Sequence, residues 1–296
     1  MEITVVDTRT GMERVLRAPA EDRLGLLAEM LEPVRGMYRF APVEVDLVDV
    51  HLRGMGFPLD RDEERCLAAL EDLARADAWN RIGAAMERGA ARLAEAVPGL
   101  EPHDVTVLLT LGDPGDAHFT DTVLGVAGFG GIWGYITITL WPFPENLERL
   151  ETTAVHELHH NLRYAPGGVV WDPATVTVGE HVVGEGLADA FARELYGDDL
   201  GRTRIAVPHL RDEAVFDKVV SGLGVTGMEN FTAWVHGDES ARRFGTAPVG
   251  LPAGAGYAAG NRLVDAYLAA TGRTAAQALR DDHAEVIDTA LARLGR

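Results

Sequence analysis

The chain has 296 residues, of which 47% are apolar and 25% charged, and these values are typical of a globular protein with a substantial buried core. Its net charge of −19 and lack of any Lys/Arg-dense stretch argue against nucleic acid as a partner. Cys66 is the only cysteine, which excludes an intramolecular disulfide and a cysteine-based zinc cluster. No stretch approaches the roughly 20 apolar residues of a membrane span, and residues 1–16 do not resemble a signal peptide. We therefore expect a cytoplasmic protein without a membrane partner.

The first third of the chain is predicted to be mainly helical, because its apolar residues recur at three- and four-residue steps. Short runs rich in β-forming residues predict strands beside these helices. The expected elements are helices over residues 21–32 and 60–97, the latter divided near residues 76–79, and strands over residues 1–7 and 43–50.

The middle of the chain changes to Val, Ile, Thr and Leu, separated by Gly, Pro and Asp. The clearest strand covers residues 133–140, where Ile136 and Ile138 alternate with threonines. We expect this strand to lie at the edge of a small sheet, where an extended peptide could pair with it. The other expected elements are strands over residues 105–111 and 122–127, helices over residues 145–164 and 177–196, and mainly helical structure from residue 207 onward.

These elements predict an α+β fold, with a small mixed sheet backed by the helix over residues 145–164. Mainly helical N- and C-terminal parts flank the sheet. We expect residues 1–100 to form a mainly helical N-terminal region and residues 101–296 to form the domain that carries the chemistry. Whether the N-terminal region packs on the same core is left open.

The sequence HELHH at residues 156–160 is an HExxH motif inside a predicted helix. Residues four apart share one face of a helix, so His156 and His160 can place two imidazole nitrogens on one zinc ion. Glu157 can turn towards the open side of that ion, take a proton from a bound water and return it to the leaving group. We expect His159 to have a packing or supporting role.

A third ligand is expected on the next predicted helix, where Glu185 stands between Gly184 and Gly186. Small flanking residues favour close packing against another helix rather than an exposed position. Three protein ligands leave the fourth tetrahedral position of zinc for water, as in catalytic sites. Asp189 lies four residues further on the same face and is a candidate to accept the other ring N–H of a ligating histidine.

The two motifs together resemble the predicted zinc-dependent proteases of the YjaZ type, which are gluzincin-like. The resemblance rests on HELHHNLRY at residues 156–164 and VGEGLAD at residues 183–189, and it spans roughly residues 105–270. It implies a zincin-like fold with Zn²⁺ as the cofactor and a peptide or a specific protein as the substrate. The site residues that it implies are the ligands His156, His160 and Glu185, the base Glu157 and the supporting Asp189.

The resemblance extends to GYAAG at residues 256–260, at the start of a predicted C-terminal helix. It implies that Tyr257 donates a hydrogen bond to the oxyanion formed during hydrolysis, with Arg262 and His236 as further candidates. A packing role for Tyr257 beneath the preceding loop is equally open.

The leading hypothesis is therefore a zinc metallopeptidase. One alternative is a non-haem iron enzyme on the same two-histidine, one-carboxylate ligands, but Glu157 would have no obvious task there. A second alternative is a non-catalytic, metal-stabilised binding or regulatory protein, which the loss of Glu157 would normally indicate. The substrate, the choice between exo- and endopeptidase and the oligomeric state are left open.

Overall fold

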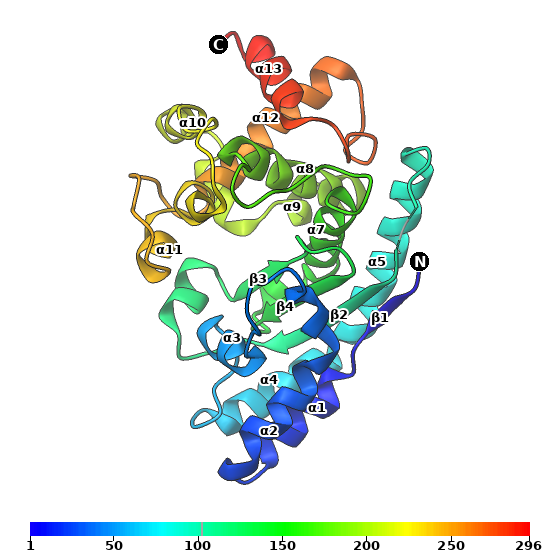
Figure 1. Cartoon of the computed structure of the whole chain (residues 1–296), viewed down its shortest axis with the longest axis vertical. Coiled ribbons are helices and arrows are strands. Elements are labelled where there is room, and N and C mark those ends of the chain that lie inside the picture. The colour runs from blue at the N-terminus through cyan, green and yellow to red at the C-terminus, as the bar shows by residue number, and fades with distance from the viewer. Residues whose placement is uncertain (102) are drawn as a thin grey trace. The chain divides into compact units, whose positions relative to one another are not determined.

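The described strands form one small mixed sheet, with three parallel strands and one antiparallel edge strand (Figure 1). Hydrophobic β2 pairs with a neighbour on each side and is buried along nearly its whole length, as expected for a strand whose two sheet faces are both covered. In spatial order the strands are β1 (Ile3–Val5), β2 (Val105–Leu111), β4 (Tyr135–Leu140) and β3 (Val126–Phe129).

The strand predicted over residues 133–140 is present as β4, but its predicted edge position is wrong, because the edge strands of the sheet are β1 and β3. β4 pairs with β2 on one side and with β3 on the other. Ile136 and Ile138 of β4 are fully buried, whereas the residues between them are half-buried. The alternation therefore reflects two sheet faces that are covered to different extents, not an open edge.

Helices dominate the N-terminal part, as predicted for residues 21–32 and 60–97. The predicted strand over residues 43–50 is wrong, because Asp46 caps a helix there by accepting hydrogen bonds from Val48 N and Asp49 N. These helices are α1 (Thr8–Arg17), α2 (Ala20–Leu31), α3 (Leu47–Arg53), α4 (Glu63–Arg75) and α5 (Ala78–Ala96).

The amphipathic helix α4 buries its apolar side, as the three- and four-residue spacing of Cys66, Leu70 and Leu73 requires. Cys66 is completely buried, and burial raises the pKa of its thiol to about 12.

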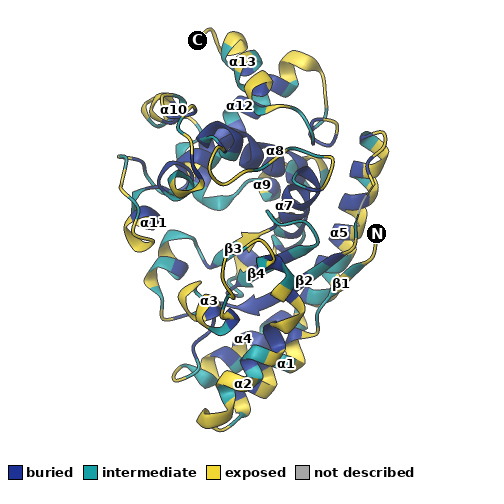
Figure 2. Ribbon diagram, in the orientation of Figure 1, coloured by how far each residue is buried: buried dark blue, intermediate teal, exposed yellow. Residues whose placement is uncertain are grey.

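The described part of the chain from residue 144 onward contains helices and no named strand. Its longest helix has nearly every side chain from Val178 to Ala192 buried (Figure 2), and the small residues predicted to pack closely do so. The helices are α6 (Pro144–Leu147), α7 (Leu150–Arg163), α8 (Val178–Tyr196), α9 (Asp198–Gly201), α10 (Glu213–Val220), α11 (Asp238–Arg243), α12 (Ala255–Thr271) and α13 (His283–Leu294).

The structure is a computed structural model and describes residues 1–101 and 103–296. The chain is divided into two compact units. One comprises Met1–Ala90 with Glu101–Asn161 and contains the sheet; the other comprises Ala91–Leu100 with Leu162–Arg296 and is helical. The expected domain boundary at residue 100 would separate two parts that fold independently. This boundary stays a prediction.

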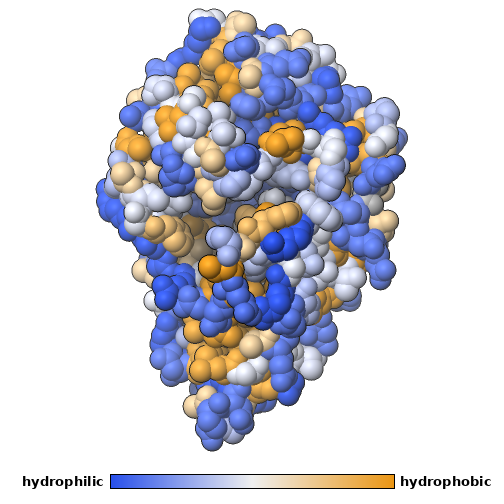
Figure 3. Space-filling model, in the orientation of Figure 1, coloured by the Kyte–Doolittle hydropathy of each residue, from blue (hydrophilic) through white to orange (hydrophobic). Residues whose placement is uncertain are grey.

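Apolar side chains reach the face seen in Figure 3 in small, separate groups among hydrophilic residues. Among the helices of the described residues, none is long and apolar enough to cross a membrane.

Candidate metal centre

The two outer histidines of the HExxH motif point to the same place from one face of α7. His156 Nε2 and His160 Nε2 are 3.1 Å apart, and the ring centroids are 4.8 Å apart. Each side chain belongs to a residue that is only 8% exposed. Two imidazole nitrogens that meet in a buried place are well arranged to share one ion.

Glu185 of α8 completes this group. One ligand atom from each of His156, His160 and Glu185 lies within 4.8 Å of the others, and all three residues are buried. No other group of at least three His, Cys, Asp or Glu residues suited to a metal occurs in the described ranges 1–101 and 103–296. Two imidazoles and one carboxylate fit Zn²⁺, because they leave a tetrahedral position open for water.

Close helix packing holds the segment of α8 that carries Glu185. Gly186 lies against the backbone of Gly260 on α12, where a Cβ atom on either glycine would overlap the other helix. The Gly260 position also approaches the carbonyl oxygen of Val182, one turn before Gly186. These contacts confirm the close packing that we predicted from the small residues around Glu185.

Glu157 is buried on α7, with 7% of its surface exposed, and it lies beside the edge strand. A Cβ atom at Gly128 of β3 would overlap the carboxyl group of Glu157, and one at Gly130 would overlap its carbonyl oxygen. Only glycine allows the edge strand to approach Glu157 so closely. The motifs discussed above do not include these glycines, although the dense run of glycines between residues 125 and 134 is a visible signal of close backbone approach.

Asn161, directly after the motif, fixes the connection between β3 and β4. This completely buried side chain uses its whole hydrogen-bonding capacity. Its Nδ2 lies 2.9 Å from each of the carbonyl oxygens of Gly130, Ile132 and Tyr135, so one of its two N–H groups is shared between two of them. Its Oδ1 accepts hydrogen bonds from Gly134 N at 3.0 Å and His103 Nε2 at 2.9 Å.

Arg163 and Tyr164, the last residues of the HELHHNLRY segment, bind the beginning of α8. The completely buried Arg163 guanidinium donates to both carboxylate oxygens of Glu180 at 2.9 Å, and Tyr164 OH donates to Oε1 at 2.8 Å. Burial alone would raise the pKa of Glu180, but Arg163, His283 and Tyr164 outweigh it and lower this pKa to about 2. Glu180 therefore stays charged and anchors α8 five residues before Glu185.

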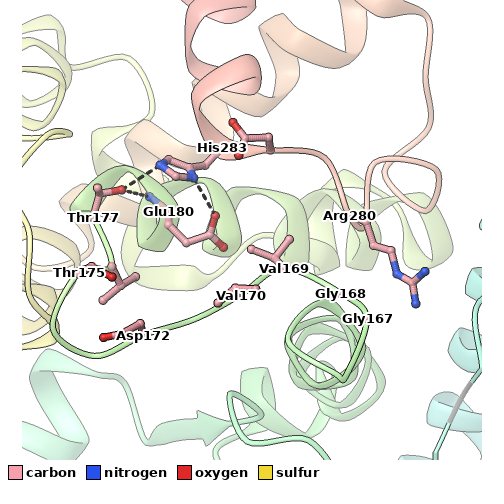
Figure 4. Close-up of a pocket in the computed structure, with 12 residues that line it drawn as sticks. Gly167, Gly168, Val169, Val170, Asp172, Thr175, Thr177, Glu180, Arg280 and His283 are labelled. Atoms are coloured by element: carbon pink, nitrogen blue, oxygen red, sulfur yellow. Dashed lines mark hydrogen bonds and ion pairs between the residues drawn. The ribbon is translucent and has the colours of Figure 1, made fainter.

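A cavity of about 540 Å³ lies beside this ion pair at the start of α8 (Figure 4). His283 contacts both Glu180 and Thr177 there, with Nδ1 3.3 Å from Glu180 Oε2 and Nε2 3.1 Å from Thr177 Oγ1. Thr177 Oγ1 also accepts the N–H of Glu180 and caps α8. None of the candidate metal ligands lines this cavity.

Comparison with known proteins agrees with the chemistry of this donor group. The family model described as "Predicted Zn-dependent protease (DUF2268)" matches residues 84–288, well over half of the chain. The chain belongs to this family. It is also 35% identical over 164 residues to the uncharacterized protein YjfC of Bacillus subtilis (strain 168). The match covers 55% of the chain and 54% of YjfC, so the chain spans about half the length of that relative. No solved structure matches.

Asp189 of α8 joins three segments of the helical unit. Its Oδ1 accepts the Thr203 hydroxyl at 2.8 Å, and its Oδ2 accepts Thr203 N at 3.0 Å and Asn261 Nδ2 at 2.7 Å. These bonds hold α8 against α12 and the segment after α9. The predicted support of a ligating histidine by Asp189 stays a prediction.

The three candidates for oxyanion stabilisation have different surroundings. Tyr257 OH lies 3.4 Å from His236 Nε2, and their rings stack at a centroid distance of 5.8 Å. Arg262 instead donates to Glu213 at 2.9 Å and lies 4.0 Å above the Phe216 ring. Because Arg262 is engaged with α10, the pair of Tyr257 and His236 is the better candidate for stabilising the oxyanion.

His159, the remaining histidine of the HELHH sequence, is completely buried, in accordance with a packing role.

Proposed function

We propose that the protein is a zinc-dependent metallopeptidase that cleaves a peptide or a specific protein. The observation that carries this proposal is the buried donor group of His156, His160 and Glu185, with a further carboxylate, Glu157, on the same helix as both histidines. These three side chains would hold the zinc ion, and zinc would polarise the scissile carbonyl and lower the pKa of water.

Glu157 acts as the general base in this proposal. It takes a proton from the hydrolytic water and passes the proton to the leaving amine. The position of its carboxyl group beside Gly128 supports this role, because β3 is an edge strand. An extended peptide that pairs with β3 would bring its backbone alongside Glu157. The absence of a side chain at Gly128 is what allows the Glu157 carboxyl group to lie against the strand.

Tyr257 and His236 provide the groups for oxyanion stabilisation. The phenol and the imidazole lie at hydrogen-bonding distance from each other, and a phenol O–H or an imidazole N–H can donate to a developing negative charge. Asp189, fixed by Thr203 and Asn261, keeps the α8 segment with Glu185 in place. It acts as a positioning residue.

Metal analysis of the purified protein and of Glu157→Gln tests the proposal. We expect about one equivalent of zinc in both, since the base is not a ligand. Cleavage of a mixed peptide library should fall about 10²- to 10⁴-fold in the variant, the usual contribution of a general base. Glu148→Gln, which alters an exposed carboxylate before α7, should keep full activity.

Several results would contradict the proposal. Equal turnover by wild type and Glu157→Gln would remove Glu157 as the base. Full zinc affinity in Glu185→Ala would remove Glu185 as the third ligand. Iron in place of zinc, together with oxygen consumption, would favour the non-haem iron alternative.

A further inference from the structure

Five aromatic and imidazole rings follow one another in the helical unit. They come from the loop before α8, from α8 itself, from the short π-helix Thr232–His236 with the residue before it, and from α12. The successive ring centroids are 6.3, 4.7, 4.7 and 5.8 Å apart, in the order Trp171, His181, Phe231, His236 and Tyr257. We call these five residues the ring row.

Every member of the ring row is half-buried. His181 makes this clearest, because all other residues of α8 from Val178 to Ala192 are buried. Trp, Tyr and His are often only partly buried in proteins, so the distinguishing feature of this row is the succession of five rings and not the burial of any one of them. Such a succession offers apolar and aromatic contact area to an external group.

The ring row passes next to the candidate metal centre along α8. His181 and Glu185 are four residues apart, so they occupy the same face on successive turns, with Cβ atoms about 5–6 Å apart. At its other end the row contains His236 and Tyr257, the pair assigned above to the oxyanion. A substrate bound at a metal ion that Glu185 helps to hold would thus lie about one helical turn from His181, whose ring centroid is 6.3 Å from that of Trp171 and 4.7 Å from that of Phe231.

We infer that Trp171, His181 and Phe231 form a subsite for an aromatic or large aliphatic side chain of the substrate. This inference rests on the proposed peptidase function and specifies its substrate class. Aromatic faces bind apolar and aromatic groups through buried area and ring stacking. The row itself contains no carboxylate to pair with Lys or Arg and no Lys or Arg to pair with Asp or Glu, so an uncharged side chain is favoured.

Peptide binding to the zinc-loaded Glu157→Gln variant tests this subsite without requiring turnover. Alanine peptides that carry a single Phe, Leu, Lys or Asp are titrated by calorimetry and compared with the all-alanine peptide. We expect the Phe and Leu peptides to bind at least about tenfold more tightly, because burial of such a side chain contributes this much. The Lys and Asp peptides should show no gain.

Substitutions added to the Glu157→Gln variant show which residues cause the difference in peptide affinity. Phe231→Ala and, separately, Trp171→Ala should bring the Phe peptide to within about twofold of the alanine peptide, because the apolar surface is lost. Phe244→Ala, which removes an aromatic residue that is 48% exposed and outside the ring row, should leave the preference intact. Trp171 lies in a loop, so its truncation keeps the test meaningful if Phe231→Ala folds poorly.

Equal affinity for the Phe and alanine peptides would overturn the inference. So would tighter binding of the Lys or Asp peptide, or a preference that neither ring substitution reduces. Failure of the proposed function gives a different result: the Phe preference persists in binding, but the wild-type protein cleaves none of the peptides.

Discussion

Glu180 keeps a charge in the interior of the helical unit because its neighbours compensate for lost hydration. Arg163 binds both of its oxygens, while Tyr164 and His283 add hydrogen bonds. Arg163 has further fixed partners in the carbonyl oxygens of Leu279 and Asp281. A buried ion pair stabilises only when its remaining polar atoms are also satisfied, and this one meets that condition.

His283 makes the stability of this network depend on pH. Its hydrogen bond to Glu180 raises the pKa of His283 above the ordinary value of 6.5. The charged form is therefore favoured by folding, so its contribution is complete below about pH 6.5 and is lost as the pH rises through the raised pKa. We predict that His283→Gln lowers the free energy of unfolding by about 1 kcal/mol at pH 5.5, and less above pH 8.

Urea unfolding over a range of pH measures this difference. His209→Gln, which alters a histidine outside the network, should show no comparable change with pH. A gap between wild type and His283→Gln that widens towards alkaline pH would contradict the assigned direction.

At the scale of elements, α8 and α12 approach each other through glycines instead of larger side chains. We predict that Gly260→Ala destabilises the protein by about 1–3 kcal/mol, because the added methyl group overlaps the backbone at Val182. Gly25→Ala is the matched control. The Cβ added there meets nothing, and helix propensity predicts a gain of up to about 1 kcal/mol.

Chemical unfolding of both variants measures these changes. Zinc affinity should also fall in Gly260→Ala, because the inserted methyl group displaces the α8 segment that carries Glu185. Equal effects of the two alanines would show that the helix crossing is not constrained at Gly260.

Some elements could be predicted from the sequence because their signals are local. The spacing of His156 and His160, and the position of Glu185 on the following helix, depend only on helical periodicity. The edge strand could not be assigned, since the alternation within β4 does not reveal that β2 pairs with it on one side and β3 on the other. At residues 43–50 the β-branched residues favour a strand, but Asp46 caps a helix by accepting two backbone hydrogen bonds, and the helix forms instead.

The supporting residues of the candidate site were harder to predict for the same reason. Asn161 and Arg163 follow the motif directly, but their partners lie up to 118 residues away in sequence. Nothing in the local pattern distinguishes an Arg that is completely buried from one on a surface. Family resemblance marked these positions without giving their contacts.

At the scale of the whole molecule, zinc binding should stabilise the folded chain, because the ligands are brought together only by folding. We predict that zinc at about 100 times its Kd adds about 2.7 kcal/mol of stability relative to protein treated with a chelator. For a chain of this size, the expected rise in Tm is several degrees, at about 2–4 °C per kcal/mol.

Scanning calorimetry of the apo and zinc-loaded protein checks this rise. Glu185→Ala should lose most of it, whereas Glu148→Gln should retain it. A Tm that does not respond to zinc would contradict the assignment of the metal centre.

The burial of Cys66 has a practical consequence for following the protein in solution. A thiol that is inaccessible, with its pKa raised to about 12, does not react with maleimides at neutral pH. A cysteine introduced at an exposed position would thus be the single reactive thiol. It could carry a fluorescent label that reports peptide binding without prior removal of the native cysteine.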